Sequence, residues 1–183
     1  MQRITLTTPP IGDYALIDSG EEQKLERYGD VLLARPDPQA LWPKGLPEAE
    51  WAKAHGRYVR TKEQGGLPAG RQGKWLHKEL PKAWDIKFGE LQFHIKPTSF
   101  KHTGLFPEQY SNWQWVAQRI KGAGRDVKIL NLFGYTGGAS LAAVAAGAEV
   151  THVDASKTAV AWASDNAKLS RLGDKPIRWI VED

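Results

Sequence analysis

The amino-acid sequence predicts an α/β protein, with a parallel sheet and helices in the C-terminal half and a small α+β domain before it. Three observations predict the parallel sheet. The apolar run Ile129 to Phe133 is typical of a buried parallel strand. A turn with three glycines between residues 134 and 138 follows this run at once. Strands and helices then alternate from residue 148 to residue 181, which is the pattern of a parallel sheet.

The elements of this half follow one another without long loops. A helix of small residues is expected at Gly138 to Ala146, and a second strand at Ala148 to Val153. A helix at Ser156 to Leu172 carries the chain to a third strand, Ile177 to Val181. Before the first strand, a helix starts at Pro107 and places Trp113 on its apolar face. We expect Trp113 to lie in the core.

The glycine turn predicts a nucleotide-binding corner. Glycines allow the backbone to approach a ligand without a clash from a Cβ atom. The helix that begins at Gly138 offers free N–H groups to a phosphate or a carboxylate. One glycine turn alone is equally compatible with an ordinary strand-to-helix connection, so the evidence from the next two strands matters.

Acidic residues stand at the ends of those two strands. Asp154 follows Gly134 by twenty residues, where an acid can accept hydrogen bonds from both ribose hydroxyls. Asp154 could instead cap the next helix, although Ser156 also suits that role. Asp183 follows the third strand and could accept a hydrogen bond from an adenine amine. The sequence therefore predicts an adenosine ligand.

The motif around the turn indicates which ligand. Gly134-Tyr-Thr-Gly137-Gly138 does not match the dinucleotide fingerprint G-x-G-x-x-G. Asn131-Leu-Phe-Gly-Tyr-Thr-Gly-Gly138 instead resembles the first motif of class I S-adenosylmethionine-dependent methyltransferases. It is most similar to the N-L-F-x-Y-T-G-G variant of the bacterial 23S ribosomal RNA large-subunit cytosine-C5 methyltransferases. Val153 to Lys157 and Phe100 to Gln109 resemble further motifs of that family, so the resemblance spans residues 100 to 183.

The resemblance implies a Rossmann-like class I methyltransferase half-domain, S-adenosyl-L-methionine as the methyl donor, ribosomal RNA as the substrate and a cytoplasmic location. No metal is expected, because the chain has no cysteine and its five histidines are scattered. Donor contacts are expected at Asn131, Phe133, Gly134, Tyr135, Thr136, Gly137, Asp154, Ala155, Asp183 and Gln109. Asn131 could also serve only to hold the loop, and Gln109 would contact the amino-acid end of the donor.

The residues that act on the methyl acceptor cannot be assigned. In the resembled family an Asp-Pro-Pro loop and a nucleophilic cysteine follow later in the chain, and cytosine-C5 methylation needs such a thiolate. This chain contains no cysteine, and its one Asp-Pro pair, Asp37-Pro38, stands in the wrong place. We expect the chain to be the N-terminal portion of a longer methyltransferase, inactive by itself.

Residues 1–97 are expected to form the small α+β domain, and residues 98–183 the donor-binding part. The predicted order in the first domain is strand, strand, helix, strand, strand. Its elements are a strand in residues 14–17, strand pieces in 24–28 and 31–34 that are broken at Gly29-Asp30, strands in 84–88 and 91–96, and a mostly helical stretch from Gln39 to His55. A glycine-rich loop at 64–74 interrupts this domain.

Basic and aromatic residues alternate near the end of the first domain. The basic residues could neutralise phosphates and the tryptophans could stack on unpaired bases. A solvated face with tryptophans in the core is the alternative. The residues concerned are Arg71, Lys74, Lys78, Lys82, Lys87, Trp75 and Trp84.

Composition limits the class of protein. The chain has 183 residues, 41% of them hydrophobic and 25% charged, with a formal net charge of +4. This is typical of a globular protein and permits a polyanionic partner. No run of about 18 apolar residues occurs, so no membrane span is expected, and no signal sequence is expected from the first residues. Oligomeric state cannot be inferred. Two other functions stay open, a nicotinamide-dependent oxidoreductase and a non-catalytic RNA-binding module.

Overall fold

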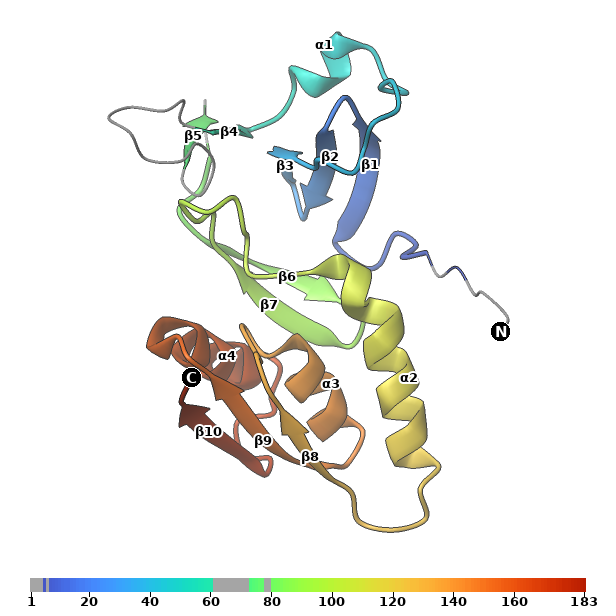
Figure 1. Cartoon of the computed structure of the whole chain (residues 1–183), viewed down its shortest axis with the longest axis vertical. Coiled ribbons are helices and arrows are strands. Elements are labelled where there is room, and N and C mark those ends of the chain that lie inside the picture. The colour runs from blue at the N-terminus through green and yellow to red at the C-terminus, as the bar shows by residue number, and fades with distance from the viewer. Residues whose placement is uncertain (1–4, 6, 61–72, 78–79) are drawn as a thin grey trace. The chain divides into compact units, whose positions relative to one another are not determined.

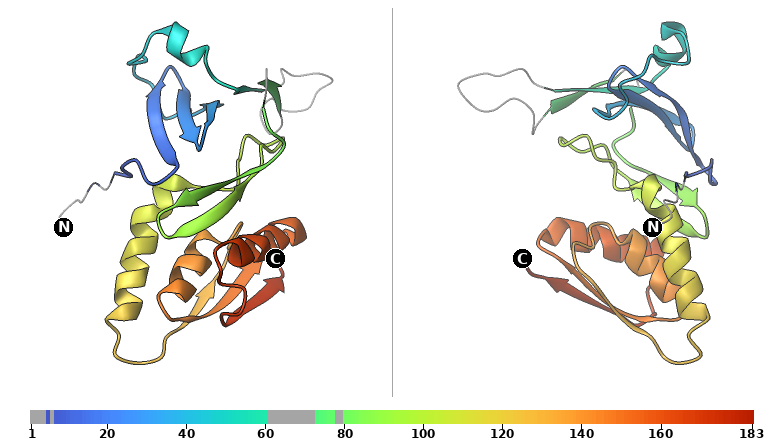
Figure 2. Two further views of the ribbon diagram at one scale, coloured as in Figure 1. Left: turned by 180° about the vertical axis from the view of Figure 1, so that it is seen from behind. Right: turned by 45° about the vertical axis from the view of Figure 1, so that its right-hand side comes forward.

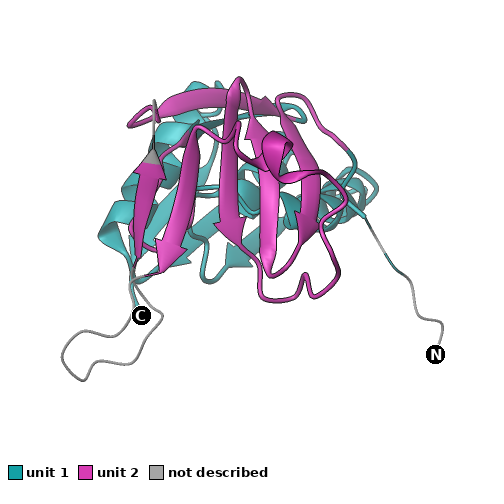
Figure 3. Cartoon of the chain, turned by 90° about the horizontal axis from the view of Figure 1, so that it is seen from above, with its two compact units in different colours: residues 1–9, 89–94, 104–183 teal, residues 10–88, 95–103 magenta. Residues whose placement is uncertain are grey.

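The computed structural model describes residue 5 and residues 7–60, 73–77 and 80–183. Contacts divide the chain into two compact units, coloured in Figure 3. The N-terminal unit consists of residues 10–88 and 95–103, and the C-terminal unit of residues 1–9, 89–94 and 104–183. The fold is mixed α/β as the sequence predicts, with a parallel three-stranded sheet in the C-terminal unit.

The N-terminal unit contains a five-stranded sheet of order β1-β2-β3-β4-β5 (Figure 1). Strands β1, β2 and β3 form an antiparallel meander. β4 pairs parallel with β3 and antiparallel with β5. A sixth strand, β6, follows. The bounds are β1 Tyr14–Gly20, β2 Gln23–Tyr28, β3 Val31–Pro36, β4 Gly56–Arg60, β5 Gly73–His77 and β6 Trp84–Phe88.

The core of this unit contains a buried charged pair. Arg35 Nε donates to Glu26 Oε2 at 2.7 Å and Arg35 Nη2 donates to Oε1 at 2.9 Å. The hydroxyls of Tyr14 and Tyr28 donate to the same Oε1 at 3.1 and 3.2 Å. Burial opposes the charge of Glu26, but Arg35 and then Lys24 hold the pKa of its carboxyl below the usual value. The network thus keeps two opposite charges in an apolar interior.

The predicted helix from Gln39 to His55 is wrong. The structure has one helical turn there, α1 at Glu48–Trp51. Prolines break the stretch, and Asp18 from β1 holds it instead, because its carboxylate accepts from Leu46 N at 2.9 Å and from Trp51 Nε1 at 2.9 Å. Strand β4 occupies residues 56–60, where no element was predicted.

The predicted glycine-rich loop at 64–74 lies largely outside the described residues. Gly73 and Lys74, its last two positions, belong to strand β5. The predicted order of strand, strand, helix, strand, strand is therefore replaced by three strands, a helical turn and four strands, the last of which is β7, Leu91–Ile95.

The C-terminal unit carries the predicted parallel sheet, in the order β10-β9-β8. Its strands are β8 Lys128–Asn131, β9 Glu149–Asp154 and β10 Ile177–Val181, and both pairings are parallel. The helices are α2 Tyr110–Lys121, α3 Gly138–Ala145 and α4 Lys157–Leu169. A 3-10 turn, Pro107–Gln109, precedes α2. Figure 2 shows α2 and α3 from two further sides.

One face of this sheet packs on the helices. Val150 of β9 is buried with Val144 of α3 and Ile120 of α2, and Ile129 of β8 packs against them. Leu130 points to the opposite face and is 62% exposed. Strand β8 therefore alternates between the two faces. The predicted parallel strand at Ile129 to Phe133 is confirmed as β8, but its expected burial and end are wrong, since β8 ends at Asn131 and Phe133 is 88% exposed.

Residues 89–94 belong to the C-terminal unit because hydrogen bonds tie β7 to α4. His94 N donates to Asn166 Oδ1 at 2.8 Å, and Trp162 Nε1 donates to His94 O at 2.8 Å. Gln92 N and O bond the hydroxyl of Ser170 at 2.9 and 3.0 Å. The sequence suggests a single boundary after residue 97. The contacts instead give several boundaries, because the chain returns to the C-terminal unit at residue 89 and again at residue 104.

Candidate functional site

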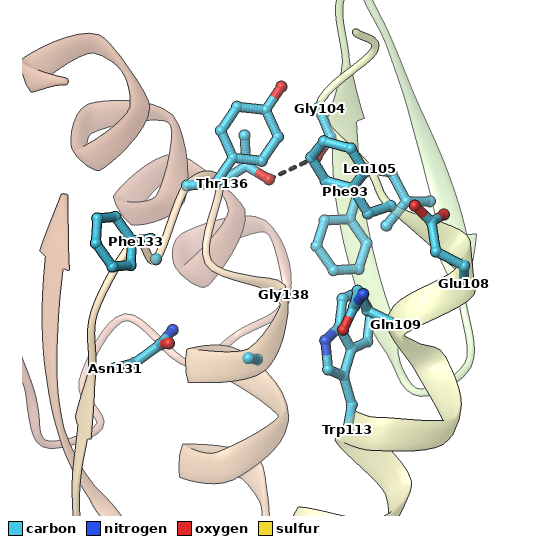
Figure 4. A pocket seen from close by; sticks show the side chains of 14 residues that line it. Phe93, Gly104, Leu105, Glu108, Gln109, Trp113, Asn131, Phe133, Thr136 and Gly138 are labelled. Carbon is cyan, nitrogen blue, oxygen red and sulfur yellow. Dashed lines mark hydrogen bonds between the residues drawn. The ribbon is translucent and has the colours of Figure 1, made fainter. Parts of the chain in front are cut away.

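A cavity of about 480 Å³ opens in the C-terminal unit between the glycine turn and the start of α2 (Figure 4). Among the residues predicted to contact a donor, the following line it: Asn131, Phe133, Gly134, Tyr135, Thr136 and Gln109. The others do not line it: Gly137, Asp154, Ala155 and Asp183. Sequence reasoning missed a further part of the wall, formed by Phe93, Leu105, Phe106, Glu108 and Trp113.

The backbone of the turn is strained. Phe133 and Tyr135 have φ values of 56° and 50°, and Gly137 has a φ of 93°. Left-handed backbone at a non-glycine residue costs about 1–3 kcal/mol and persists where neighbouring contacts enforce it. Here Gly134 N donates to Val153 O at 2.9 Å, and Gly137 N donates to Gly134 O at 3.0 Å. The turn is therefore held in one shape at the edge of the cavity.

The N-terminus of α3 lies at this cavity. The residue before the helix, Gly137, provides no side-chain cap. Gly138 and Ala139, the first two residues of the helix, line the cavity. Helix N-terminal N–H groups without a capping side chain, together with the positive end of the helix dipole, favour an anionic group. The site is therefore suited to a carboxylate or a phosphate.

Asp154 holds the turn from the end of β9. Its Oδ2 accepts from Tyr135 N at 2.8 Å, and its Oδ1 accepts from Ser156 N at 2.9 Å. Ser156, not Asp154, caps α4, because its hydroxyl accepts from Ala159 N at 3.2 Å. A carboxylate has about four acceptor positions, and Asp154 is half-buried. It can therefore still accept hydrogen bonds from a ligand.

A buried polar layer supports Asn131 beneath the turn. Asn131 Nδ2 donates to Ser140 Oγ at 2.8 Å, and Ser140 Oγ lies 2.9 Å from His152 Nδ1. Ser140 and His152 are fully buried. Burial lowers the pKa of His152, while the nearby Asp154 raises it in part, so the ring is neutral at pH 7. With Nδ2 engaged, Asn131 keeps its amide oxygen as an acceptor for a ligand.

Aromatic rings line the opposite wall. Trp113 stacks on Phe93 with ring centroids 5.9 Å apart, and the ring centroids of Phe106 and Tyr135 are 5.3 Å apart. Trp113 is 7% exposed, so the prediction that it lies in the core is confirmed. Electron-rich ring faces attract a cation within about 6 Å of the centroid. A sulfonium group would suit this wall.

The segment before α2 is fastened to the turn. The hydroxyl of Thr136 donates to Gly104 O, and Figure 4 shows this hydrogen bond as a dashed line. Gly104 has a φ of 95° and lies against the ring of Trp162. Gln109 is exposed and its Oε1 accepts from Asn112 Nδ2 at 2.9 Å. Ala155 and Asp183 are also exposed.

The described residues include no group of three or more His, Cys, Asp or Glu side chains that could hold a metal ion. The polar groups available at the cavity are amides, hydroxyls and a carboxylate. An uncapped helix N-terminus, an amide oxygen and an aromatic wall match the carboxylate, the ammonium and the sulfonium of S-adenosylmethionine, respectively. The residues present therefore fit this donor.

Comparison with known proteins identifies the family. The family described as S-adenosylmethionine-dependent methyltransferase matches residues 44–176, which is more than half of the chain. This chain therefore belongs to the S-adenosylmethionine-dependent methyltransferases, a class I methyltransferase family that uses S-adenosyl-L-methionine. Of the functions that the sequence leaves open, the comparisons thus favour the methyltransferase.

Among curated proteins, the chain is similar to the ribosomal RNA large subunit methyltransferase K/L of two genera. It is 40% identical over 158 residues to that of Shewanella baltica, covering 86% of this chain and 20% of the relative. It is 32% identical over 162 residues to that of Pseudoalteromonas atlantica, covering 81% of this chain and 22% of the relative. The chain thus spans about a fifth of the length of these relatives.

Among solved structures, the S-adenosylmethionine-dependent methyltransferase of Agrobacterium tumefaciens matches with a TM-score of 0.85 and 45% identity. The match covers 94% of this chain and 53% of that chain. SMU.776, solved in complex with SAH, matches with a TM-score of 0.66 and 18% identity over 94% of this chain and 46% of that chain. The second match supports the fold alone.

No helix among the described residues is long and apolar enough to cross a membrane.

Proposed function

We propose that the cavity beside the glycine turn binds S-adenosyl-L-methionine, and that this chain supplies the donor-binding part of a methyltransferase that acts on ribosomal RNA. The observation that carries the proposal is the uncapped N-terminus of α3, whose residues Gly138 and Ala139 face the cavity. The donor carboxylate lies on these amides in the proposed complex. The donor ammonium donates a hydrogen bond to Asn131 Oδ1, and Gln109 contacts the same amino-acid end of the donor.

Asp154 binds the ribose in this proposal. Its carboxylate is fixed by Tyr135 N and Ser156 N, so its orientation is set before the ligand binds. Asp183, at the end of β10, accepts from the adenine amine. Phe133, Tyr135, Thr136 and Gly137 shape the turn around the donor, and Ala155 adjoins the ribose. Methyl transfer is an in-line attack, to which the protein contributes mainly by orienting donor and acceptor.

Calorimetric titration with S-adenosylmethionine and its demethylated product tests this site. We expect Asp154→Ala to weaken binding by about 1–3 kcal/mol, the effect of leaving buried hydrogen-bonding groups without a partner. Asp165→Ala is the matched control, because Asp165 is an exposed acid on α4 that pairs only with Lys168 among described residues. Equal affinity of the Asp154→Ala variant and wild type would contradict the ribose assignment.

Ribosomal RNA is the proposed substrate because the curated relatives are named as ribosomal RNA large subunit methyltransferases. Transfer of a labelled methyl group from the donor to ribosomal RNA, measured with the complete protein, tests this. Failure to label RNA while a protein or a small molecule is labelled would overturn it. A location in the cytoplasm, where ribosomal RNA is found in bacteria, goes with this substrate.

The finer assignment, methylation at cytosine C5, rests on the likeness of residues 131–138 to that branch of the class. The reaction at C5 needs a thiolate that adds to the ring. These 183 residues contain no cysteine, so they do not supply this group. Digestion of labelled RNA to nucleosides, followed by mass spectrometry, identifies the methylated base and thereby tests the assignment.

A further inference from the structure

Strands β3 and β4 of the N-terminal unit separate before they end. Only two pairs of residues are in register between them, Leu33 with Gly56 and Ala34 with Arg57. Beyond these pairs, Pro36 has no N–H group with which to continue the ladder. The residues past the last pair, on both strands, line a cavity of about 320 Å³. We call it the β3–β4 cavity, and its volume is at the lower end of ligand sites, which range over about 300–1,000 Å³.

Four cationic side chains gather at the β3–β4 cavity. Arg35 and Arg60 line it. Lys101 Nζ donates to Pro36 O, a cavity residue, at 3.3 Å. Lys24 stands opposite Arg35 across the β2–β3 ladder. The cations therefore come from three strands and from the loop that contains Lys101.

Among the residues that the structure describes, two of these cations form ion pairs and two do not. Arg35 forms the buried pair with Glu26, and Lys24 lies 3.6 Å from the same carboxylate. Arg60 is exposed. Neither Arg60 nor Lys101 makes an ion pair with any residue that the structure describes. The contact of Lys101 with Pro36 is to a neutral carbonyl, so its positive charge stays available.

The backbone at Lys101 indicates a constrained position. Lys101 has a φ of 66°, which is rare for a lysine. Arg35 Nη1 donates to Lys101 O at 3.0 Å and Thr98 N donates to His102 O at 2.9 Å. Strain of this kind is stored where surrounding contacts enforce it, often at ligand sites. These bonds hold the backbone of the loop, and the hydrogen bond to Pro36 O places the ammonium of Lys101 beside the cavity.

The positive field at this place affects the titration of nearby groups. Burial lowers the pKa of Lys101, and Arg60, Lys24 and Arg35 lower it further, whereas Asp37 raises it. Burial also lowers the pKa of His102, with Arg35, Lys101 and Lys24 adding to the effect. An anion bound here would relieve this repulsion between like charges.

Carboxylates that line the β3–β4 cavity reduce its positive charge but do not cancel it. Glu21 and Glu22 line the cavity and are exposed. Glu21 lies 3.6 Å from the ammonium of Lys44, outside the cavity lining. Exposed carboxylates are screened by solvent within about 10 Å, whereas Lys101 is half-buried. The anion is therefore expected between Lys101 and Arg60.

We propose that the β3–β4 cavity binds a phosphodiester group of the RNA substrate between Lys101 and Arg60. The proposal rests on the proposed function, because a ribosomal RNA substrate makes a phosphodiester the anion at hand. A lysine acts as a point charge on phosphate, and an arginine as a planar fork. Contacts to phosphate position an RNA without reading its sequence. The cavity thus contributes to holding the acceptor rather than to choosing the base.

Salt-dependent RNA binding tests this site. The probe is a fluorescent single-stranded ribosomal RNA oligonucleotide, and anisotropy gives the affinity at several salt concentrations. Each phosphate contact to a single strand contributes about 0.7 to the slope of log affinity against log salt concentration. We expect Arg60→Ala and Lys101→Gln each to lower the slope by about 0.7, and Arg60→Lys to restore it. Lys53→Ala is the control, since Lys53 is an exposed lysine of the same unit, paired with Glu50.

Two further measurements separate the possible outcomes. Donor affinity, measured on the same variants, should equal that of wild type, because both cations lie in the N-terminal unit. Unchanged salt slopes with normal donor binding would overturn the phosphate site and leave the proposed function standing. If the variants lose affinity for inorganic phosphate while their affinity for RNA is unchanged, the cavity is a site for free phosphate and the RNA proposal is overturned. An acidic peptide that displaces the RNA at equal charge would likewise overturn it.

Discussion

Ser140 Oγ lies 2.9 Å from His152 Nδ1, and both side chains are fully buried below the glycine turn. Ser140 also accepts from Asn131 Nδ2, which joins a residue of the cavity wall to the interior of the unit. His152 Nε2 has no hydrogen-bond partner among the described residues. The ring also fills the space under Gly134, where a Cβ atom would stand 2.3 Å from His152 Cε1. His152 therefore fixes both the shape of the turn and the orientation of Asn131.

The link between Ser140 and His152 predicts non-additive stability. We expect Ser140→Ala and His152→Leu each to lower the free energy of unfolding by about 1–3 kcal/mol, since each leaves a buried polar partner unsatisfied. The double variant removes both partners, so its loss should be smaller than the sum by about 0.5–3 kcal/mol. Urea unfolding of the four proteins measures this. Strict additivity would show that the two side chains do not interact.

The same histidine predicts a pH dependence of stability. Burial lowers the pKa of His152 below its ordinary value of 6.5. The unfolded chain then binds the proton more readily than the folded chain, so the free energy of unfolding decreases as the pH falls below about 6.5 and stops decreasing below the folded-state pKa. Asp154 opposes the shift in part.

Urea unfolding at pH 7.5 and at pH 5.5 provides the measurement. The loss on acidification should be smaller in His152→Leu than in wild type. His102 of the N-terminal unit has a pKa lowered by burial and by Arg35, so His102→Gln serves as the second variant and separates the two contributions. The same acid-induced loss in wild type and His152→Leu would contradict the assignment to His152.

The sequence predicted best where one local pattern decides the structure. Strand β10 has the predicted bounds, Ile177–Val181, because β-branched and aromatic residues, which favour strands, make up four of its five positions. The turn at Gly134 and the cap at Ser156 were likewise visible in the residue types. The methyltransferase class came from the resemblance of residues 131–138 to a motif of that class, and the family match confirms it.

The misses have a common physical reason, which is that distant partners decide the structure. Residues 39–55 were expected to be mostly helical. Prolines interrupt the stretch, and Gly45 N and Leu46 N donate to the carboxylate of Asp18, more than twenty residues earlier. The aromatic wall of the cavity comes from Phe93 and Trp113, which belong to different elements. His152 looked like an ordinary strand residue. Its place two residues after Val150, on the same face of an apolar strand, was the signal that a polar partner had to exist.

Gly138 predicts a steric effect on donor binding. A Cβ atom at Gly138 would stand 2.2 Å from Trp113 Cζ2, so Gly138→Ala must displace the indole that lines the cavity. Overpacking of this kind costs typically about 1–3 kcal/mol. We expect Gly138→Ala to lose stability by that amount and to weaken donor binding. Urea unfolding and calorimetry provide the two readings.

Two further variants give this prediction its control and its rescue. Gly173→Ala places a Cβ 3.5 Å from Lys168 Cγ, an ordinary contact, and should leave both readings unchanged. Trp113→Leu gives the new methyl group room. Gly138→Ala should therefore lower the free energy of unfolding less in the Trp113→Leu background than it does in the wild type. An equal loss in both backgrounds would show that the indole of Trp113 is not the group with which the methyl group clashes.

The buried pair of Glu26 and Arg35 predicts a large effect in the N-terminal unit. Glu26→Gln leaves the guanidinium of Arg35 without a counter-charge in the interior, where breaking a buried ion pair costs about 3–5 kcal/mol. An arginine side chain stays protonated in proteins, so the guanidinium cannot escape the loss of Glu26 by releasing its proton. Urea unfolding of the whole protein, monitored by circular dichroism, measures the loss of free energy of unfolding.

The exposed pair of Lys53 and Glu50 provides the matched control. Its side chains are 59% and 43% exposed, and such pairs contribute about 0–1 kcal/mol. Glu50→Gln should therefore change the free energy of unfolding only slightly. Replacing Glu26 by leucine and Arg35 by methionine together should recover part of the loss, although the hydroxyls of Tyr14 and Tyr28 then lack their acceptor. Equal effects of Glu26→Gln and Glu50→Gln would show that the buried charge is compensated by other means.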